Sequence, residues 1–304
     1  MTPPAADGHR ADASRLLTAW EAARSQGLNN RAAAAVLKIS EAELLASGCG
    51  RFVTRLTADS RALLRELPVL GEIKAVVRNP SAVIERDGTI RSIENRSVSS
   101  DAVLADRFEL ICETAQWTKG FALREKTPGG LKLSAQFFTA AGISAAKFFL
   151  RPASDVHAFT RLVAAFVSAD QSTQETISAG PPASSASLEH PRPVAPGSLM
   201  AFLQMVCQLR QSLTFVARNE AACISTSKVI ERVKRSDRGG WVNVLDDGLD
   251  IHLHEDGIRY LKPVADKDGD GGWLHWCTED QAIALSVRCD QAWQALARSA
   301  GAEP

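Results

Sequence analysis

The sequence has no excess of either charge, because 35 lysines and arginines balance 35 aspartates and glutamates. A chain of zero net charge has no long-range attraction for a phosphate backbone or an anionic membrane surface. The sequence also lacks any uninterrupted apolar run long enough to cross a bilayer. These absences lead us to expect neither a nucleic-acid partner nor a membrane partner.

Cysteine pairs of the C-x-x-C type are also missing, although the chain contains six cysteines. Their scattered spacing predicts neither a zinc knuckle nor a redox pair. The N-terminal segment MTPPAADGHRADASR contains no apolar core of the kind that a secretory signal peptide needs. We therefore expect a cytoplasmic protein whose thiols are reduced and mostly buried.

The apolar share of 45% and the charged share of 23% are those of a globular protein, and its first part has helical patterns. Apolar residues recur at helical spacing over residues 16–23, and an alanine-rich segment follows at residues 31–38. Ser40 and Glu43 then form a capping box. We expect three consecutive helices here.

From residue 72 the pattern changes to strands. Ile73–Val77 is an apolar, β-branched run, and a second run at Ser81–Glu85 is followed by Asp87–Gly88, a strong hairpin-turn signal. Residues 131–138 and 147–150 form another expected strand pair. A helix with apolar positions at helical spacing follows, up to Phe166.

Residues 168–197 are dense in serine, proline, glycine and alanine, which is typical of a flexible linker. Beyond it we expect a helix over Leu199–Leu209, a strand-rich region, and a final helix around Trp293. The chain is thus divided into an N-terminal half (1–167), a linker (168–197) with few hydrogen bonds, and a shorter C-terminal half (198–304).

The two strand regions resemble each other. VVRNPSAVI at residues 76–84 parallels VARNEAACI at residues 216–224, and both contain an Arg-Asn pair in the same place. This similarity indicates a tandem duplication in which Arg78 and Arg218 are equivalent. The expected fold class is α+β, with two similar halves.

Five segments, in this order, resemble the HemS/ChuS/HmuS family of bacterial hemin-handling proteins. They are KISEAELL (38–45), SRALLRELPVLGEIKAVVRN (60–79), SAQFF (134–138), KFFLRPASDVHAF (147–159) and WVNVLDDGLDIHLHED (241–256). The resemblance implies a tandem repeat of two β-rich halves with large antiparallel sheets and flanking helices. It also implies heme as cofactor, bound in a cleft between the halves, and a role in heme trafficking or degradation for iron acquisition.

The resemblance breaks at several residues that hold heme in the family. The family's axial histidine lies in a D-[TV]-H-x-F-F helix that opens the second half, and this helix is missing here. Ile111 stands where the family has an arginine that faces the heme, and Ile84 stands where it has a histidine. Isoleucine supplies apolar contact but neither an iron ligand nor a hydrogen bond. The heme site is therefore expected to be degenerate.

Four candidate heme-binding residues remain. Lys262 matches a family lysine that lies near the heme, and Arg288 falls near a family arginine in the last strand. His157 lies in a segment, DVHAF, that imitates the axial motif, but it follows the first half's last strand, where the family has a non-ligating helix. His254 is an addition to the family pattern, whereas the neighbouring His252 matches it.

Other metal readings are weaker. His252 and His254 alternate along an expected strand and so point to one face, which makes a metal pair conceivable but a hydrogen-bonded role for His252 more natural. The DxDxDG segment at residues 266–271 resembles a calcium loop, but its twelfth position is Cys277 instead of a glutamate. His190 lies in the linker, where a lone histidine is usually exposed.

Two functions are compatible with these residues. The first is a cytoplasmic heme-handling protein with an altered ligand set. The alternative is a non-enzymatic scaffold that no longer binds heme and takes a protein partner or another hydrophobic ligand. In either case Trp117 and Trp241 lie within well-matched segments, and we expect both to be largely buried.

Overall fold

The computed structural model describes residues 6–127, 129–178, 191–237, 239–267, 271–290 and 293–300. The chain folds into two compact units. Unit 1 comprises Met1–Ile73, Ser97–Asp101 and Glu113–Pro181, and unit 2 comprises Lys74–Arg96, Ala102–Cys112 and Pro182–Pro304. Unit 2 therefore contains strands from both halves of the sequence. The division into 1–167, 168–197 and 198–304 stays a prediction.

Unit 1 combines helices with a small antiparallel sheet. Its helices are α1 (Ala6–Ser25), α2 (Asn30–Leu37), α3 (Glu41–Ala46), α4 (Ser60–Glu66), η1 (Leu67–Leu70), η2 (Thr114–Gln116) and α5 (Val156–Ala165). Its sheet runs in the order β1 (Val53–Leu56), β6 (Lys119–Thr127), β7 (Gly130–Phe138) and β8 (Ser144–Leu150), each strand antiparallel to the next. The expected strand pair at 131–138 and 147–150 is confirmed as β7 and β8.

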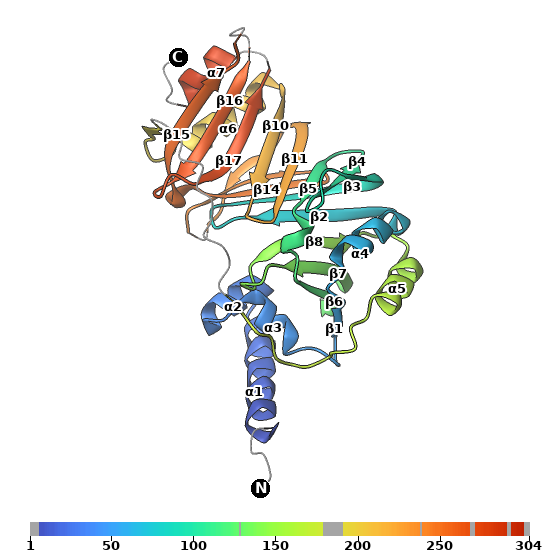
Figure 1. Ribbon diagram of the computed structural model, residues 1–304. Helices are drawn as coiled ribbons and strands as arrows, with labels where there is room; N and C mark the ends of the chain where they lie inside the picture. The colour runs from blue at the N-terminus through green and yellow to red at the C-terminus, as the bar shows by residue number, and fades with distance from the viewer. Residues whose placement is uncertain are drawn as a thin grey trace. The chain divides into compact units, whose positions relative to one another are not determined.

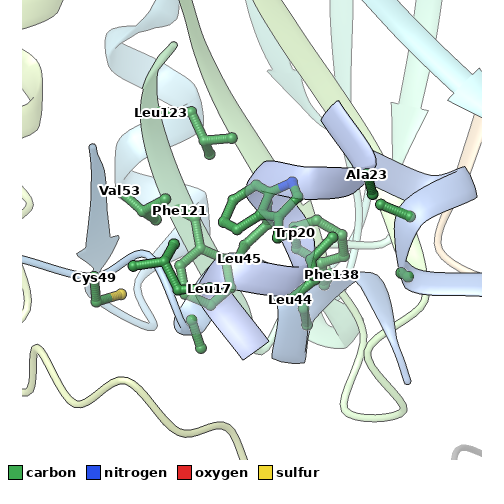
Figure 2. Close-up of a cluster of buried hydrophobic side chains, with 14 residues drawn as sticks. Leu17, Trp20, Ala23, Leu44, Leu45, Cys49, Val53, Phe121, Leu123 and Phe138 are labelled. Carbon is green, nitrogen blue, oxygen red and sulfur yellow. The ribbon is translucent and has the colours of Figure 1, made fainter. Parts of the chain in front are cut away.

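The core of unit 1 lies between its first three helices and the sheet (Figure 2). Trp20 of α1 is fully buried among leucines of α3 and phenylalanines of β6 and β7. Its indole nitrogen donates to Asn30 Oδ1 at 3.0 Å, so the polar end of the ring is also satisfied. The predicted capping box is present, since Ser40 accepts from the Glu43 backbone and Glu43 accepts from the Ser40 backbone.

Unit 2 is built mainly of strands, together with the helices α6 and α7 (Figure 1). Its elements are β2 (Glu72–Arg78), β3 (Ala82–Asn95), β4 (Asp101–Ala105), β5 (Glu109–Cys112), β9 (Arg192–Pro193), α6 (Ser198–Leu209), β10 (Ser212–Arg218), β11 (Ala222–Val229), β12 (Val233–Arg235), β13 (Trp241–Asp246), β14 (Leu249–His254), η3 (Glu255–Gly257), β15 (Ile258–Ala265), β16 (Gly272–Thr278), β17 (Ile283–Cys289) and α7 (Trp293–Ser299). The first residues of β2 and β4 belong to unit 1.

Two antiparallel groups of strands can be followed in unit 2. One runs β9-β15-β16-β17-β10-β11-β5, and the other runs β12-β13-β14-β3. The helices lie against one face of the first group, where Trp276 of β16 packs on Phe202 of α6 with ring centroids 5.5 Å apart. Trp293 of α7 packs closely on Gly272 of β16, since a Cβ at position 272 would lie 2.8 Å from the indole ring. The helices expected over 199–209 and around Trp293 are thus confirmed.

The predicted duplication is visible in the pairing of the strands. Arg78 ends β2 and Arg218 ends β10, and the asparagine after each closes the turn into the next strand. Strands are also exchanged between the halves: β14 of the second half pairs with β3 of the first, and β5 of the first half pairs with β11 of the second. This reciprocal exchange explains why one compact unit contains both halves. The α+β fold with two repeated, largely antiparallel halves is confirmed.

Asn79 and Asn219 make this exchange specific. Asn79 Oδ1 accepts from the backbone of Ser81 and Ala82, and its Nδ2 donates to the carbonyls of Arg218 and Ala284 at 3.1 and 2.8 Å. Asn219 has the matching arrangement and donates to the carbonyl of Arg78 at 3.0 Å.

We expect Asn79→Ala to lower the free energy of unfolding by about 1–3 kcal/mol, because backbone groups on both halves lose their hydrogen-bond partner. Urea unfolding followed by circular dichroism measures the loss. Asn219→Ala should give a similar loss, since it occupies the equivalent position. Two variants as stable as the parent chain would show that the paired asparagines do not hold the halves together.

The predicted turn at Asp87–Gly88 is wrong. Strand β3 runs straight through these residues, and the Asp87 backbone N–H donates to Gly248 at 2.9 Å in line with the β14 pairing. Gly88 is needed for a close approach instead, because a Cβ at this position would lie 3.0 Å from the ring of Phe108. Pairing with a strand far along the sequence has overridden the local turn signal.

The expectation of a linker with few hydrogen bonds is wrong for its first part, residues 168–178. These residues contain no helix, but they lie along β1, where the Arg55 guanidinium donates to the carbonyls of Ser172 and Gln174 and pairs with Glu175. Lys119 also pairs with Glu175, at 2.9 Å. The remaining linker positions up to His190 lie outside the described residues.

Three further expectations meet different outcomes. Trp117 is buried, with 1% of its surface exposed, as expected, whereas Trp241 is only partly buried. All six cysteines are unpaired thiols, and four of them are fully buried. Among the described residues, no helix combines the length and apolarity needed to span a membrane.

Candidate functional site

One face of the larger strand group in unit 2 carries a line of side chains from neighbouring strands. Lys262, His275, Ser286, Val216 and Ser225 stand directly opposite one another across β15, β16, β17, β10 and β11. Residues opposite each other in antiparallel strands point to the same side. We call this side of the strands the outer face. It also carries Trp273 and Arg288, each two residues along its strand from this line, and Ile111 in the adjoining row. The side chains that alternate with these along each strand point to the other side, toward α6 and α7.

His275 is held firmly on this face. Its Nδ1 lies 2.8 Å from the hydroxyl of Ser286, which is only 3% exposed. Its ring lies parallel to the indole of Trp273, with an interplanar angle of 5° and centroids 6.0 Å apart. Burial lowers the pKa of His275, and the nearby charges of Arg218 and Lys262 lower it further. The imidazole is therefore neutral at neutral pH.

Lys262 stands next to this imidazole, on the strand that pairs with it. The side chain is partly buried, and within the described part of the chain no carboxylate forms an ion pair with it. Arg218, at the end of β10, is exposed on the same face. The outer face thus has a net positive character beside His275, suited to an anionic group.

Arg288 is also on the outer face, but its charge is already engaged. Its guanidinium donates two parallel hydrogen bonds to Asp266, at 2.8 and 2.6 Å, and a third to Asp290 at 2.7 Å. It also lies over the ring of Trp273, 5.7 Å from the centroid. A ligand carboxylate would have to compete with two protein carboxylates for this side chain.

The two isoleucines differ in their surroundings. Ile111 of β5 is partly exposed and belongs to the outer face, in the row formed with Cys223 and Arg218. Ile84 is fully buried opposite Ile251 of β14. The expectation that both isoleucines offer apolar contact to a ligand stays a prediction.

The histidines of β14 point to the same side of their strand, as the alternation predicts. His252 Nδ1 lies 2.7 Å from Asn243 Oδ1, and its Nε2 lies 4.0 Å from a Glu85 oxygen. His254 packs against Trp241 with ring centroids 5.1 Å apart. Within the described residues, no three potential ligands gather into a metal site. A hydrogen-bonded role for His252 is therefore the one its surroundings support.

The candidates chosen from the sequence are only partly brought together. Lys262 and Arg288 share the outer face, His254 lies in the other strand group of unit 2, and His157 is exposed on α5 of unit 1. Sequence reasoning missed His275 and its partner Ser286. The alternation of Trp273, Leu274, His275 and Trp276 was the available signal, since it places one imidazole on the less buried side of a strand.

The chain is thus a duplicated α+β protein whose outer sheet face carries an imidazole, an indole and an ammonium group. The family model of the haemin-degrading HemS/ChuX domain matches residues 38–166. The chain is 36% identical to the hemin transport protein HmuS of Yersinia pestis over 148 aligned residues. The aligned region covers 48% of this chain and 42% of that protein. The chain therefore aligns with less than half of the length of this curated relative.

Solved structures match over a much larger share. The heme-binding protein PhuS of Pseudomonas aeruginosa, in its holo form, superimposes with a TM-score of 0.84 at 25% identity, covering 94% of this chain and 98% of that one. The heme-degrading enzyme ChuS of Escherichia coli O157:H7 has the same fold, with a TM-score of 0.83 at 21% identity over 96% of this chain and 100% of that one. The family model and these relatives place the similarity of the chain in the HemS/ChuS/HmuS family.

Proposed function

We propose that this chain handles heme, binding it on the outer face and passing it on or presenting it for degradation in iron acquisition. The relatives named above are described as hemin-transport, heme-binding and heme-degrading proteins. The observation that carries the proposal is the grouping of Lys262, His275 and Trp273 on one sheet face. Strands of both halves contribute to this face, in keeping with a ligand bound where the halves meet.

The residues present fit a heme. A protein holds heme through an axial ligand, apolar or aromatic walls, and cations for the propionates. The outer face offers a neutral imidazole, the indole of Trp273, the apolar side chains of Ile111 and Val216, and the ammonium group of Lys262. Bound heme would supply the iron chemistry, and this chain's part is to bind, orient and partly desolvate it.

Two features support a degenerate form of the family's site. Residues 166–178 and 191–197, the described stretches between α5 and α6, contain no helix that could carry an axial histidine. The arginine on this face, Arg288, is tied to Asp266 and Asp290. The six free thiols support a cytoplasmic location, because reduced cysteines persist there.

A hemin titration followed at the Soret band tests the proposal. Lys262→Ala should weaken binding by about 1.5–3 kcal/mol, or roughly tenfold to a hundredfold, because a partly desolvated propionate loses its cation. Lys126→Ala is the matched control, since Lys126 is exposed on β6 of unit 1 and should leave the affinity unchanged. Binding that is weak, broad and indifferent to both variants would overturn heme as the ligand.

The alternative, a scaffold that binds a protein partner or another hydrophobic ligand, rests on the same engaged Arg288 and on the burial of Ile84. In that case the outer face keeps its shape but not its cofactor. The titration separates the two functions, because a scaffold that has lost heme gives only nonspecific porphyrin adsorption.

A further inference from the structure

The six histidines of the chain differ sharply in what their nitrogens can do. His9 and His190 lie where the side chains are not described. His157 is exposed on α5 of unit 1. His252 has Nδ1 bound to Asn243 and its Nε2 facing Glu85. His254 stands in the other strand group, against Trp241. His275 alone among the described histidines lies on the outer face.

The ring of His275 is oriented as an iron ligand requires. A ligating imidazole uses one nitrogen for the metal and donates the N–H of the other to a fixed acceptor, which sets the tautomer. Nδ1 of His275 lies 2.8 Å from the hydroxyl of Ser286, which accepts the N–H when the ring is in the Nδ1-protonated tautomer. Ser286 is itself only 3% exposed and stands directly opposite on β17, so it holds the ring from a rigid element. Nε2 is the nitrogen left for a ligand.

In that tautomer Nε2 carries the lone pair. A ligating histidine must be neutral, and burial together with the charges of Arg218 and Lys262 lowers the pKa of His275. The same two cations can pair with anionic propionates.

The neighbours of His275 add aromatic and apolar surface to this face. The indole of Trp273 lies beside the imidazole on the same strand, with the two rings parallel, and the mostly buried side chain of Val216 continues the row beyond Ser286. Ile111 adds apolar surface from the first half. Isoleucine and valine cannot ligate iron, whereas the imidazole of His275 can.

From these contacts we infer that His275 is the axial ligand of heme iron in this chain and that Ser286 positions it. The inference rests on the proposed heme function and names the residue that replaces the missing axial helix. It assigns Lys262, directly across on β15, to a propionate. Ser286 acts through His275 and is a positioning residue.

The test is a hemin titration of the full chain with absorption and electron paramagnetic resonance spectra of the ferric complex. His275→Ala should abolish the histidine-ligated spectrum, and added imidazole should restore it by entering the vacated space. Ser286→Ala should keep a histidine-ligated spectrum but weaken binding by about tenfold to a hundredfold, as is usual when the partner of a metal ligand is removed. His157→Ala and His254→Ala are the controls and should behave like the parent chain.

The possible outcomes separate the inference from the function on which it rests. If the parent chain gives a sharp ligated spectrum that survives in His275→Ala, or is lost instead in His157→Ala or His254→Ala, heme binding stands and the assignment to His275 is overturned. If the parent chain itself gives only a broad, weak spectrum, both are overturned. Circular dichroism shows whether each variant is folded, and His275→Gln, which keeps a polar side chain of similar size, replaces the alanine variant if that one unfolds.

Discussion

Replacing Trp117 with alanine should lower the free energy of unfolding by about 3–5 kcal/mol, the usual cost of removing a large buried aromatic side chain. The indole is 1% exposed and stacks on Phe137 with centroids 4.7 Å apart. It also meets the ring of Phe148 at 6.4 Å, so it joins β7 and β8 beneath η2. Alanine would leave a cavity that these strands cannot close. Urea unfolding at constant pH measures the loss.

Trp241→Ala is the matched control, because it removes the same side chain from a partly exposed position. Trp241 lies at the start of β13 and has the ring of His254 as its aromatic neighbour. Its loss should cost clearly less than that of Trp117. Equal losses for the two variants, or a loss below about 1 kcal/mol for Trp117→Ala, would contradict the packing described for η2.

Lys147→Met is expected to be comparably damaging, by about 3–5 kcal/mol, because it leaves a buried carboxylate without its partner. Lys147 of β8 and Glu41 at the first position of α3 form an ion pair, and the two residues are 8% and 6% exposed. The second oxygen of Glu41 is buried without a hydrogen bond. The carboxylate therefore depends on the lysine, and thermal or urea unfolding of the variant measures that dependence.

The double variant Glu41→Met, Lys147→Met should recover most of the stability lost by the single one. Replacing both members of a buried ion pair by apolar residues of similar size is often neutral, since the cost of desolvating two charges disappears with them. A double variant as unstable as Lys147→Met would mean that the lysine stabilises the fold through its packing over Phe138 instead.

The sequence predicted the local parts of the fold well, because caps and periodicity act over a few residues. The capping box of α3, the strand pair β7–β8 and the helix α6 follow from such signals. The turn at Asp87–Gly88 failed for the opposite reason. Its signal is local, but β3 gains a longer pairing with β14, some 160 residues away, and the glycine accommodates Phe108.

The candidate site depended on information that a single sequence does not contain. A motif-based comparison selects residues that resemble known ligands, and so it found Lys262 and Arg288 but passed over His275. The grouping of Lys262, His275 and Ser286 depends on the register of three strands. A shift of one residue in any of them would turn its side chain to the other face. Similarly, the ion pairs of Arg288 with Asp266 and Asp290 could not be read from spacing alone.

The exchange of strands between the halves gives this single chain the architecture of a covalently joined dimer. In a dimer of two identical chains, each copy would lend one strand to the sheet of the other, just as β14 and β5 are lent to β3 and β11 here. Joining the copies in one chain replaces a concentration-dependent association by a high effective concentration. The connecting segment then needs only enough length to join the two halves, so its sequence is free to become rich in serine and proline. The two copies, no longer obliged to be identical, can also diverge, so that most strands of the outer face come from one half and the other half adds β5.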